Sequence, residues 1–292
     1  MLFRSNECDL GVGEIADQLV DDPDTGAILL FLETFRDAPN LARAARRAFE
    51  KGKPVIAFKL GRSDVGRRAA ASHTGAMVGT DDTAKAFFRA HGIMRVDMLE
   101  TLFELPQLVI GKRPPKGKRV AVVTGTGGAA AMVADRLGVL GADVVPPSPP
   151  VIEKLKGQGI TVNDAVITDI PMGGSDRGAY TAILSALLAS DHCDAVVSVI
   201  GSSSMTNPDV IKDRVLKAEP KTKPLAVYLA PRADNGLLLL QEHGVASFRT
   251  PESCADAVNT YVNWYAPTAE VRVDAGKISA AAQALKDSVD GR

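Results

Sequence analysis

Short apolar runs alternate with amphipathic stretches of helical period along almost the whole chain of 292 residues. The main apolar runs cover residues 26–33, 54–60, 119–124 and 195–200. Segments whose apolar residues recur every three to four positions separate these runs, and that spacing is typical of amphipathic helices. A strand–helix alternation of this kind predicts an α/β fold built on mainly parallel sheets.

The length and one polar segment indicate two domains. Domains contain roughly 100–200 residues, so this chain is long enough for two. Residues 111–118, GKRPPKGK, are basic and rich in proline and glycine, as expected at a domain boundary. The alternation then restarts at residue 119. We therefore expect small doubly wound domains at 1–112 and 113–266, followed by an Ala-rich polar linker or tail at 267–292.

Composition and charge exclude several classes of protein. Lysine and arginine number 34 against 35 acidic residues, and no basic block stands out, so neither a nucleic acid nor a membrane surface is an expected partner. The apolar run near 27–32 is far shorter than the ~20 residues of a transmembrane helix. The three cysteines are isolated, and no histidine has metal-ligand spacing beside it. A cytoplasmic protein with no metal site is the resulting prediction.

A histidine lies within a run of small residues, Ser72-His73-Thr74-Gly75-Ala76. We expect this run to form a loop between the strand at 54–60 and a helix at 82–91. Small side chains would let a bulky polyanion approach the imidazole, and Gly75 permits backbone angles that other residues resist. A single histidine in a loop is more often a surface polar residue, so the motif alone does not decide its role.

Glu33 ends the apolar run at 26–33. Ligands of open parallel sheets gather outside the carboxyl ends of the strands, where both Glu33 and the segment that carries His73 are expected. A carboxylate bonded to one imidazole nitrogen fixes the tautomer and leaves the other nitrogen as a nucleophile. On spacing alone, however, a strand-end glutamate that binds solvent or a helix N-terminus is the more common case.

Residues 125–130, GTGGAA, join a predicted strand to a predicted helix and fit two kinds of ligand site. They satisfy the G-x-G-x-x-A dinucleotide fingerprint, and Asp143 lies about where a ribose-binding acid is sought, although it would begin its strand rather than end it. They also suit a turn that opens a phosphate-binding helix, because free amides and the helix dipole favour an anion. A purely structural turn is the third alternative. The amides concerned are those of Gly127, Gly128, Ala129 and Ala130.

From about residue 6 to about residue 266, the chain resembles the NDP-forming acyl-CoA synthetases, a superfamily that includes succinyl-CoA synthetase and the ADP-forming acetate–CoA ligases. The resemblance is strongest in GRSDVGRRAAASHTGAMVGTDDTAKAFFRAHGIMRV, around His73, and in the glycine-rich turn. It implies two flavodoxin-like, three-layer domains. It also implies that His73 is phosphorylated, that Glu33 supports it, and that Thr74, Gly75 and residues 127–130 bind phosphate. The residues implied in binding the acyl substrate are Asp169, Gly173, Gly174, Gly201, Ser202 and Ser203.

The resemblance further implies a reaction in which a small carboxylic acid, CoA and NTP give acyl-CoA, NDP and phosphate. CoA and ATP/ADP, or GTP/GDP, with Mg would be substrates of the complete enzyme, bound mostly outside this chain. The CoA-binding domain and the ATP-grasp domain or subunit of such enzymes are not recognisable here, so the chain is expected to be a fragment that is inactive alone and that assembles with like or unlike chains. One alternative is a non-catalytic ligand-sensing module of an acetyltransferase-type fusion. Another, a nicotinamide-dependent oxidoreductase, rests only on residues 125–130.

Overall fold

The computed structural model describes residues 9–34, 37–74, 80–170 and 177–268. Its first half contains a parallel sheet of three strands in the order β1-β2-β3. The elements are α1 (Val12–Asp21), β1 (Ile28–Leu32), α2 (Ala38–Glu50), β2 (Val55–Lys59), α3 (Asp64–Thr74), α4 (Asp81–Ala90), β3 (Met94–Val96), α5 (Leu99–Glu104) and α6 (Pro106–Val109).

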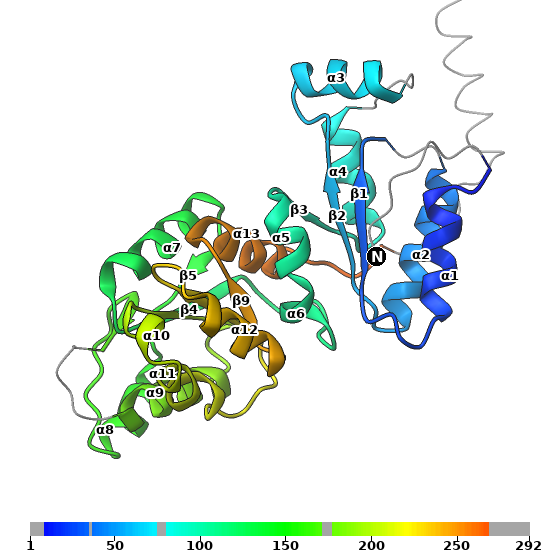
Figure 1. Cartoon of the computed structure of the whole chain (residues 1–292). Coiled ribbons are helices and arrows are strands. Elements are labelled where there is room, and N and C mark those ends of the chain that lie inside the picture. The colour runs from blue at the N-terminus through cyan, green and yellow to red at the C-terminus, as the bar shows by residue number, and fades with distance from the viewer. Residues whose placement is uncertain (1–8, 35–36, 75–79, 171–176, 269–292) are drawn as a thin grey trace, which may run out of the picture.

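Alternate residues of these strands face two different cores. In β1, Ile28 and Leu30 pack with α1, α2 and α4 in one apolar cluster. In β2, Val55 and Ala57 belong to the same cluster, whereas Ile56 between them belongs to a second cluster on the opposite face. Side chains alternate between the faces of a strand, so a continuous apolar run can fill both cores. The first sheet is therefore covered on both faces (Figure 1).

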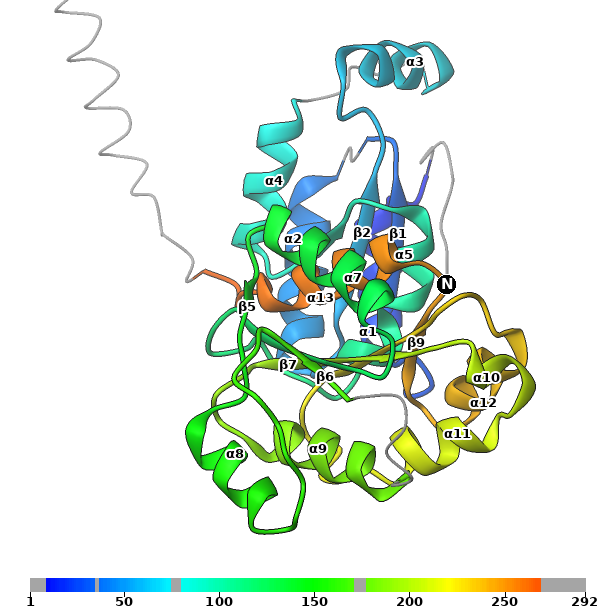
Figure 2. The ribbon, with the colours of Figure 1, turned by 90° about the vertical axis from the view of Figure 1, so that its left-hand side faces the viewer.

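The second half contains a six-stranded parallel sheet with the order β5-β4-β7-β8-β9, in which β6 also pairs with β4. Figure 2 shows α8 and α9 on one side of this sheet and α7 on the other. The elements are β4 (Arg119–Thr124), α7 (Gly127–Val139), β5 (Asp143–Val144), α8 (Pro149–Lys156), β6 (Ile167–Asp169), α9 (Arg177–Ala189), β7 (Ala195–Ile200), α10 (Ser203–Thr206), α11 (Asp209–Ile211), the π-helix η1 (Lys212–Leu216), β8 (Leu225–Leu229), α12 (Asp234–Glu242), β9 (Ala246–Phe248) and α13 (Pro251–Val262).

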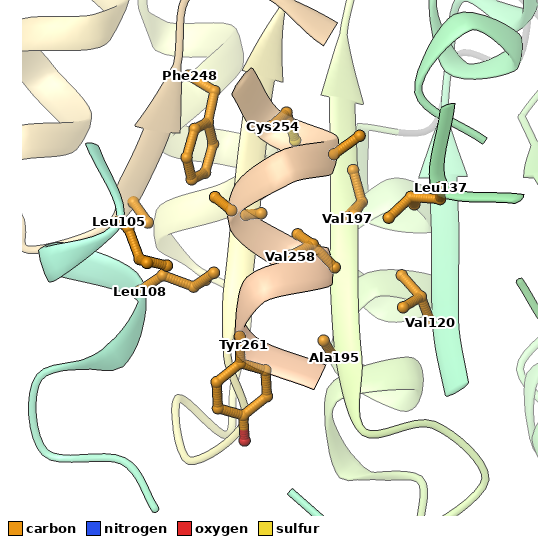
Figure 3. Close-up of a cluster of buried hydrophobic side chains, with 14 of the residues drawn as sticks. Leu105, Leu108, Val120, Leu137, Ala195, Val197, Phe248, Cys254, Val258 and Tyr261 are labelled. Atoms are coloured by element: carbon orange, nitrogen blue, oxygen red, sulfur yellow. The ribbon is translucent and has the colours of Figure 1, made fainter. Parts of the chain in front are cut away.

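One apolar core joins the two halves. Helix α13 ends the second half, and its buried residues pack with β7 and α7 and also with α5 and α6 of the first half. Figure 3 shows Cys254 and Val258 of α13 lying between Leu105 and Leu108 on one side and Leu137 of α7 on the other. The chain then returns to the first half, where the buried indole Nε1 of Trp264 donates a hydrogen bond to the Gly92 carbonyl at 2.9 Å.

Helices α1 and α2 pack with their main chains in close approach at Gly13. A Cβ atom added there would lie 2.3 Å from the Leu41 amide nitrogen and 2.6 Å from the Asn40 carbonyl carbon. We predict that Gly13→Ala lowers the free energy of unfolding by about 1–3 kcal/mol, the usual cost of overpacking, because main-chain atoms must move. Urea denaturation followed by circular dichroism would measure this loss.

Gly138 provides the matched control for this prediction. It also lies within a helix, α7, but a Cβ atom added there would meet no atom within 4 Å. Gly138→Ala should raise the free energy of unfolding by about 0.4–1 kcal/mol, because alanine restricts the unfolded chain. Equal effects of the two substitutions would contradict the close approach of α1 and α2.

The structure confirms the predicted α/β fold with mainly parallel sheets. The strand expected at 119–124 is β4 with the same bounds. Helix α8 was not anticipated, although Ser148 followed by proline at the first helical position is a recognised start signal. Residues 209–216 form a short α-turn, α11, followed by the π-helix η1. The proposed domain ranges stay a prediction.

Candidate functional site

Two neighbouring strands of the first sheet end at the same edge. Leu32 of β1 pairs with Lys59 of β2, and the Leu60 amide donates to the Leu32 carbonyl at 2.8 Å. Glu33 follows β1 and is half-buried, and the chain after β2 leads within a few residues into α3. The segment with Glu33 and the segment that leads to His73 therefore start side by side.

The backbone of His73 is helical, which corrects the expectation of a loop. Ser72, His73 and Thr74 form the last turn of α3, whereas Gly75 lies outside the described residues. The correction has a local cause, because residues 69–71 are all alanine, the strongest helix former, and Asp64 lies in the first turn. The predicted contact between the His73 imidazole and Glu33 stays a prediction.

Lys59, the last residue of β2, is a buried cation that the sequence analysis missed. Only 5% of its surface is exposed. Its Nζ donates to the Glu33 carbonyl at 2.6 Å and to the Leu60 carbonyl. Burial is the main cause that lowers the pKa of the ammonium group. A lysine at the end of an apolar run resembles an ordinary solvated strand end, so nothing local revealed its burial.

Three strands of the second sheet bring predicted site residues to another edge. Thr124, at the carboxyl end of β4, is paired with Asp169 of β6 and with Val199 of β7. The turn 125–126 follows β4, and Gly201 follows β7 directly. The glycine-rich turn, Asp169 and Gly201 are consequently grouped at one edge, although they are far apart in the sequence.

The start of α7 has amide groups available for a ligand. The Thr126 side chain makes no capping hydrogen bond, and within the described part of the chain no acceptor lies against the amides of Gly127, Gly128 and Ala129. A Cβ atom on Gly127 would lie 3.0 Å from Asp169 Oδ2, so glycine is what lets that carboxylate approach the turn. The helix dipole favours negative charge at this position, and the Asp169 carboxylate is one such charge.

Arg214 is a second charged residue at this edge that sequence reasoning missed. Its Nη1 lies 3.6 Å from the position that a Cβ atom on Gly125 would take. The guanidinium carbon lies 5.2 Å from the ring centroid of the buried Tyr180, at cation–π distance. Among the described residues no carboxylate forms an ion pair with Arg214. Arg214 belongs to η1, and π-helical turns are frequent at functional sites, but they cannot be recognised from sequence periodicity.

The remaining predicted substrate residues have different outcomes. Gly173 and Gly174 lie outside the described residues. Ser202 and Ser203 are exposed at the start of the short helix α10. Asp169 also lines a recess of about 180 Å³ whose walls are both polar and apolar. The residues around this recess are Gly159, Ile160, Thr161, Val162, Asp169, Ile170, Ala179 and Ile183.

The position of Asp143 disfavours the dinucleotide interpretation of the glycine-rich turn. Asp143 begins β5 and is paired with Arg119, the first residue of β4. It therefore lies at the end of β4 opposite to the turn at 125–126. A ribose-binding acid belongs at the carboxyl edge of the sheet, beside the turn.

The two candidate edges are separate in space. Figures 1 and 2 both show α3, which carries the His73 backbone, apart from α7. A cavity of about 320 Å³ lies where α4 and β3 meet α13, and its lining includes Arg95, Asp256 and Asn259 but none of the predicted site residues.

Comparisons with known proteins agree with this architecture. Residues 4–109 match the family described as the succinyl-CoA ligase-like flavodoxin domain. Acetate–CoA ligase (ADP-forming) II subunit alpha of Pyrococcus furiosus is 28% identical over 265 residues, which cover 88% of this chain and 57% of that subunit. Over most of its length the chain is thus similar to the alpha subunits of ADP-forming acetate–CoA ligases, and residues 4–109 belong to the succinyl-CoA ligase-like flavodoxin domain family.

Two further proteins show the extent of the likeness. A trans-feruloyl-CoA synthase from an unidentified prokaryote is 31% identical over 75% of this chain and 32% of its own length. The dinucleotide-forming acetyl-CoA synthetase 1 of Candidatus Korarchaeum cryptofilum, solved in complex with phosphate and ADP, has a TM-score of 0.74 and 26% identity over 89% of this chain and 57% of that one. This chain thus spans just over half the length of the Pyrococcus subunit and of the Korarchaeum structure.

Two further observations concern metals and membranes. Within the ranges that the structure describes, no three or more His, Cys, Asp or Glu side chains are grouped as metal ligands. In the same ranges, none of the helices has the length and apolar character needed to span a bilayer.

Proposed function

We propose that this chain is the phosphohistidine-bearing part of an acid–CoA ligase (NDP-forming). The observation that carries the proposal is the common edge of β1 and β2, where Glu33 follows one strand and the segment leading to His73 follows the other. Family membership supports it, because ADP-forming acetate–CoA ligase subunits match nearly the whole chain.

The proposed reaction divides one difficult displacement into three steps. The His73 imidazole attacks the terminal phosphorus of NTP, a P–N bond forms, and NDP leaves with the electrons of the broken P–O bond. A carboxylate oxygen of the acid then attacks this phosphorus, which releases the imidazole and gives an acyl phosphate. The CoA thiolate attacks the acyl carbon and displaces phosphate, which completes the covalent catalysis.

Charges at the edge of the second sheet support a role in holding the phosphoryl group or the acyl phosphate. The amides of Gly127 and Gly128 and the Arg214 guanidinium all lie beside the turn at 125–126. Amides at a helix start and a planar guanidinium are both suited to phosphate oxygens. Because α3 and α7 are apart in both views, a covalent carrier such as phosphohistidine would serve to move phosphate between separate sites.

The complete enzyme would need groups from beyond this chain. We propose that a CoA-binding domain and an ATP-grasp domain or subunit bind CoA and the nucleotide with Mg. The acid would be a small carboxylic acid, and the recess beside Asp169, where Ile160 and Ile170 contribute apolar surface, is the place proposed for its alkyl group. The Korarchaeum structure in complex with phosphate and ADP supports these ligand classes.

Radiolabelled acetyl phosphate tests the proposal on this chain alone. The reverse of the second step transfers its phosphoryl group to His73 and needs neither CoA nor nucleotide. We expect covalent label that is acid-labile and alkali-stable, as phosphohistidine is. If the chain takes up no such label, either from acetyl phosphate or from labelled NTP with an ATP-grasp partner, the ligand-sensing alternative is favoured instead.

Glu33→Gln should slow this labelling by about 100- to 10,000-fold, the usual contribution of a base or orienting group. The amide keeps the size of the side chain but removes the negative charge that would stabilise the imidazole during attack. Label uptake measured against time gives the rate, and circular dichroism verifies the fold. Glu100→Gln, at an exposed position at the start of α5, is the matched control. An unchanged rate in folded Glu33→Gln would refute the assigned role.

A further inference from the structure

Lys59 has an arrangement that ordinary strand-end lysines lack. It is almost completely buried, and its ammonium group donates hydrogen bonds to main-chain carbonyls. Within the described ranges, no carboxylate lies at ion-pair distance from it. Burying a charged group is costly unless it is paired or hydrogen-bonded. A methionine would fill similar space without this cost, so a cation at this position calls for a specific explanation.

The two acceptor carbonyls belong to the two segments of the proposed catalytic edge. One is the carbonyl of Glu33, and the other is the carbonyl of Leu60, the first residue after β2. The pairing of β1 with β2 does not depend on Lys59, because the Leu60 amide already donates a hydrogen bond to the Leu32 carbonyl. Lys59 Nζ therefore connects the two segments beyond the last main-chain hydrogen bond between them.

The charged groups around Lys59 come from every neighbouring element. The carboxylates of Glu33, after β1, and of Asp81, in α4, favour its protonated form, whereas Arg95 of β3 opposes it. Arg95 is itself bound by Asp81, with Nη2 and Oδ1 2.6 Å apart. Lys59 thus lies in a balanced set of charges in which the Glu33 carboxylate is one of two attractive partners.

We propose that Lys59 is a positioning residue for the reaction of His73 with phosphate. Its ammonium group holds the main chain at Glu33 and at Leu60, and so determines where the Glu33 carboxylate stands relative to the segment that leads into α3. This inference rests on the proposed function, because the geometry it maintains matters for phosphoryl transfer only if His73 and Glu33 act together.

Lys59→Met tests the inference, because it removes all N–H donors while keeping a long apolar stem. We expect phosphorylation of His73 by acetyl phosphate to be about 10- to 100-fold slower at saturating donor, since a displacement of about 1 Å can cost that much. The KM for acetyl phosphate should stay within about twofold of the wild-type value, because the Lys59 ammonium group is buried and bonded to main-chain carbonyls rather than open to a ligand. The thermal midpoint should change little, because removal of a buried charge is stabilising whereas the Glu33 and Leu60 carbonyls lose their donor.

Lys85→Met is the matched control. Lys85 lies in α4, is largely exposed, and has its Nζ 3.7 Å from the same Asp81 carboxylate. The Lys85→Met variant should be phosphorylated by acetyl phosphate at the wild-type rate. A folded Lys59→Met protein with the wild-type rate, or one whose rate falls only in proportion to its folded fraction, would overturn the proposal.

Hydrogen exchange distinguishes this inference from the proposed function. In Lys59→Met the amides of residues 32–34 and 60–64 should exchange faster, whereas those of β7 should not change. If the wild-type chain takes up no label but this exchange pattern is observed, the proposed function is wrong. The structural role of Lys59, which holds the main chain at Glu33 and Leu60, is then still supported. Unchanged exchange in both segments would overturn the role of Lys59, whatever the labelling shows.

Discussion

Replacing His73 by alanine is expected to abolish the incorporation of acid-labile, alkali-stable phosphate into this chain. The proposed relay passes through one imidazole, and alanine removes it, whereas a phosphate ester on Ser72 or Thr74 would not be acid-labile and alkali-stable. Labelling with acetyl phosphate, followed by proteolysis and location of the labelled peptide, would measure the effect. The wild-type label should be in the peptide that contains residue 73.

His243→Ala is the control for this substitution. His243 is an exposed residue that ends α12, and its Nδ1 lies 2.8 Å from the Leu239 carbonyl oxygen. Its loss should leave labelling unchanged. Histidine-linked label that persists in His73→Ala would show that another residue is the acceptor. Label that is lost in alkali would indicate an acyl phosphate on a carboxylate instead.

Replacing Trp264 by alanine should lower the free energy of unfolding by about 3–5 kcal/mol, the usual range for large aromatic residues in a core. The indole is 4% exposed and lies edge-on to Phe49, with ring centroids 5.9 Å apart. Its loss also leaves the buried Gly92 carbonyl without the Nε1 donor, which adds a desolvation cost. Because α13 and Trp264 connect both halves, the whole chain should unfold in one transition.

Urea denaturation followed by circular dichroism is the suitable measurement, since Trp264 is the only tryptophan and its fluorescence is lost in the variant. Tyr265→Ala is the matched control, because this neighbouring ring is 38% exposed and mainly contacts the Arg89 guanidinium. We expect less than about 1 kcal/mol for it. Two separate transitions, only one of them shifted by Trp264→Ala, would show that the halves fold independently.

The strands could be predicted because buried strands consist of short runs of apolar residues. Every residue of β7 is buried, and the run at 195–200 contains no charged residue that would mark a solvent-facing side. Glu33 could likewise be placed at a sheet edge, because it follows such a run. Helix α3 was missed because the small residues before Gly75 were interpreted as a loop, although alanine is the strongest helix former.

The cations that lie near the two edges could not be predicted. Lys59 and Arg214 each follow or precede apolar residues in the ordinary way, and their roles depend on groups from other elements. The ammonium group of Lys59 finds a carbonyl after β1, and the Arg214 guanidinium reaches the turn after β4. Contacts of this kind arise from strand order and helix packing, which short-range periodicity does not specify.

The sequence by itself determined the α/β class, the strand positions and the residues at the carboxyl ends of the strands, because these depend on local patterns of apolar side chains. Only the tertiary structure decided how the halves join. Helix α13 is buried on nearly all sides, but apolar side chains can pack against any apolar partner, and the partner proved to include α5 and α6 of the first half. The hydrogen bond from Trp264 to Gly92 fixes that choice, because a buried indole N–H must find an acceptor and this one lies far away in the sequence.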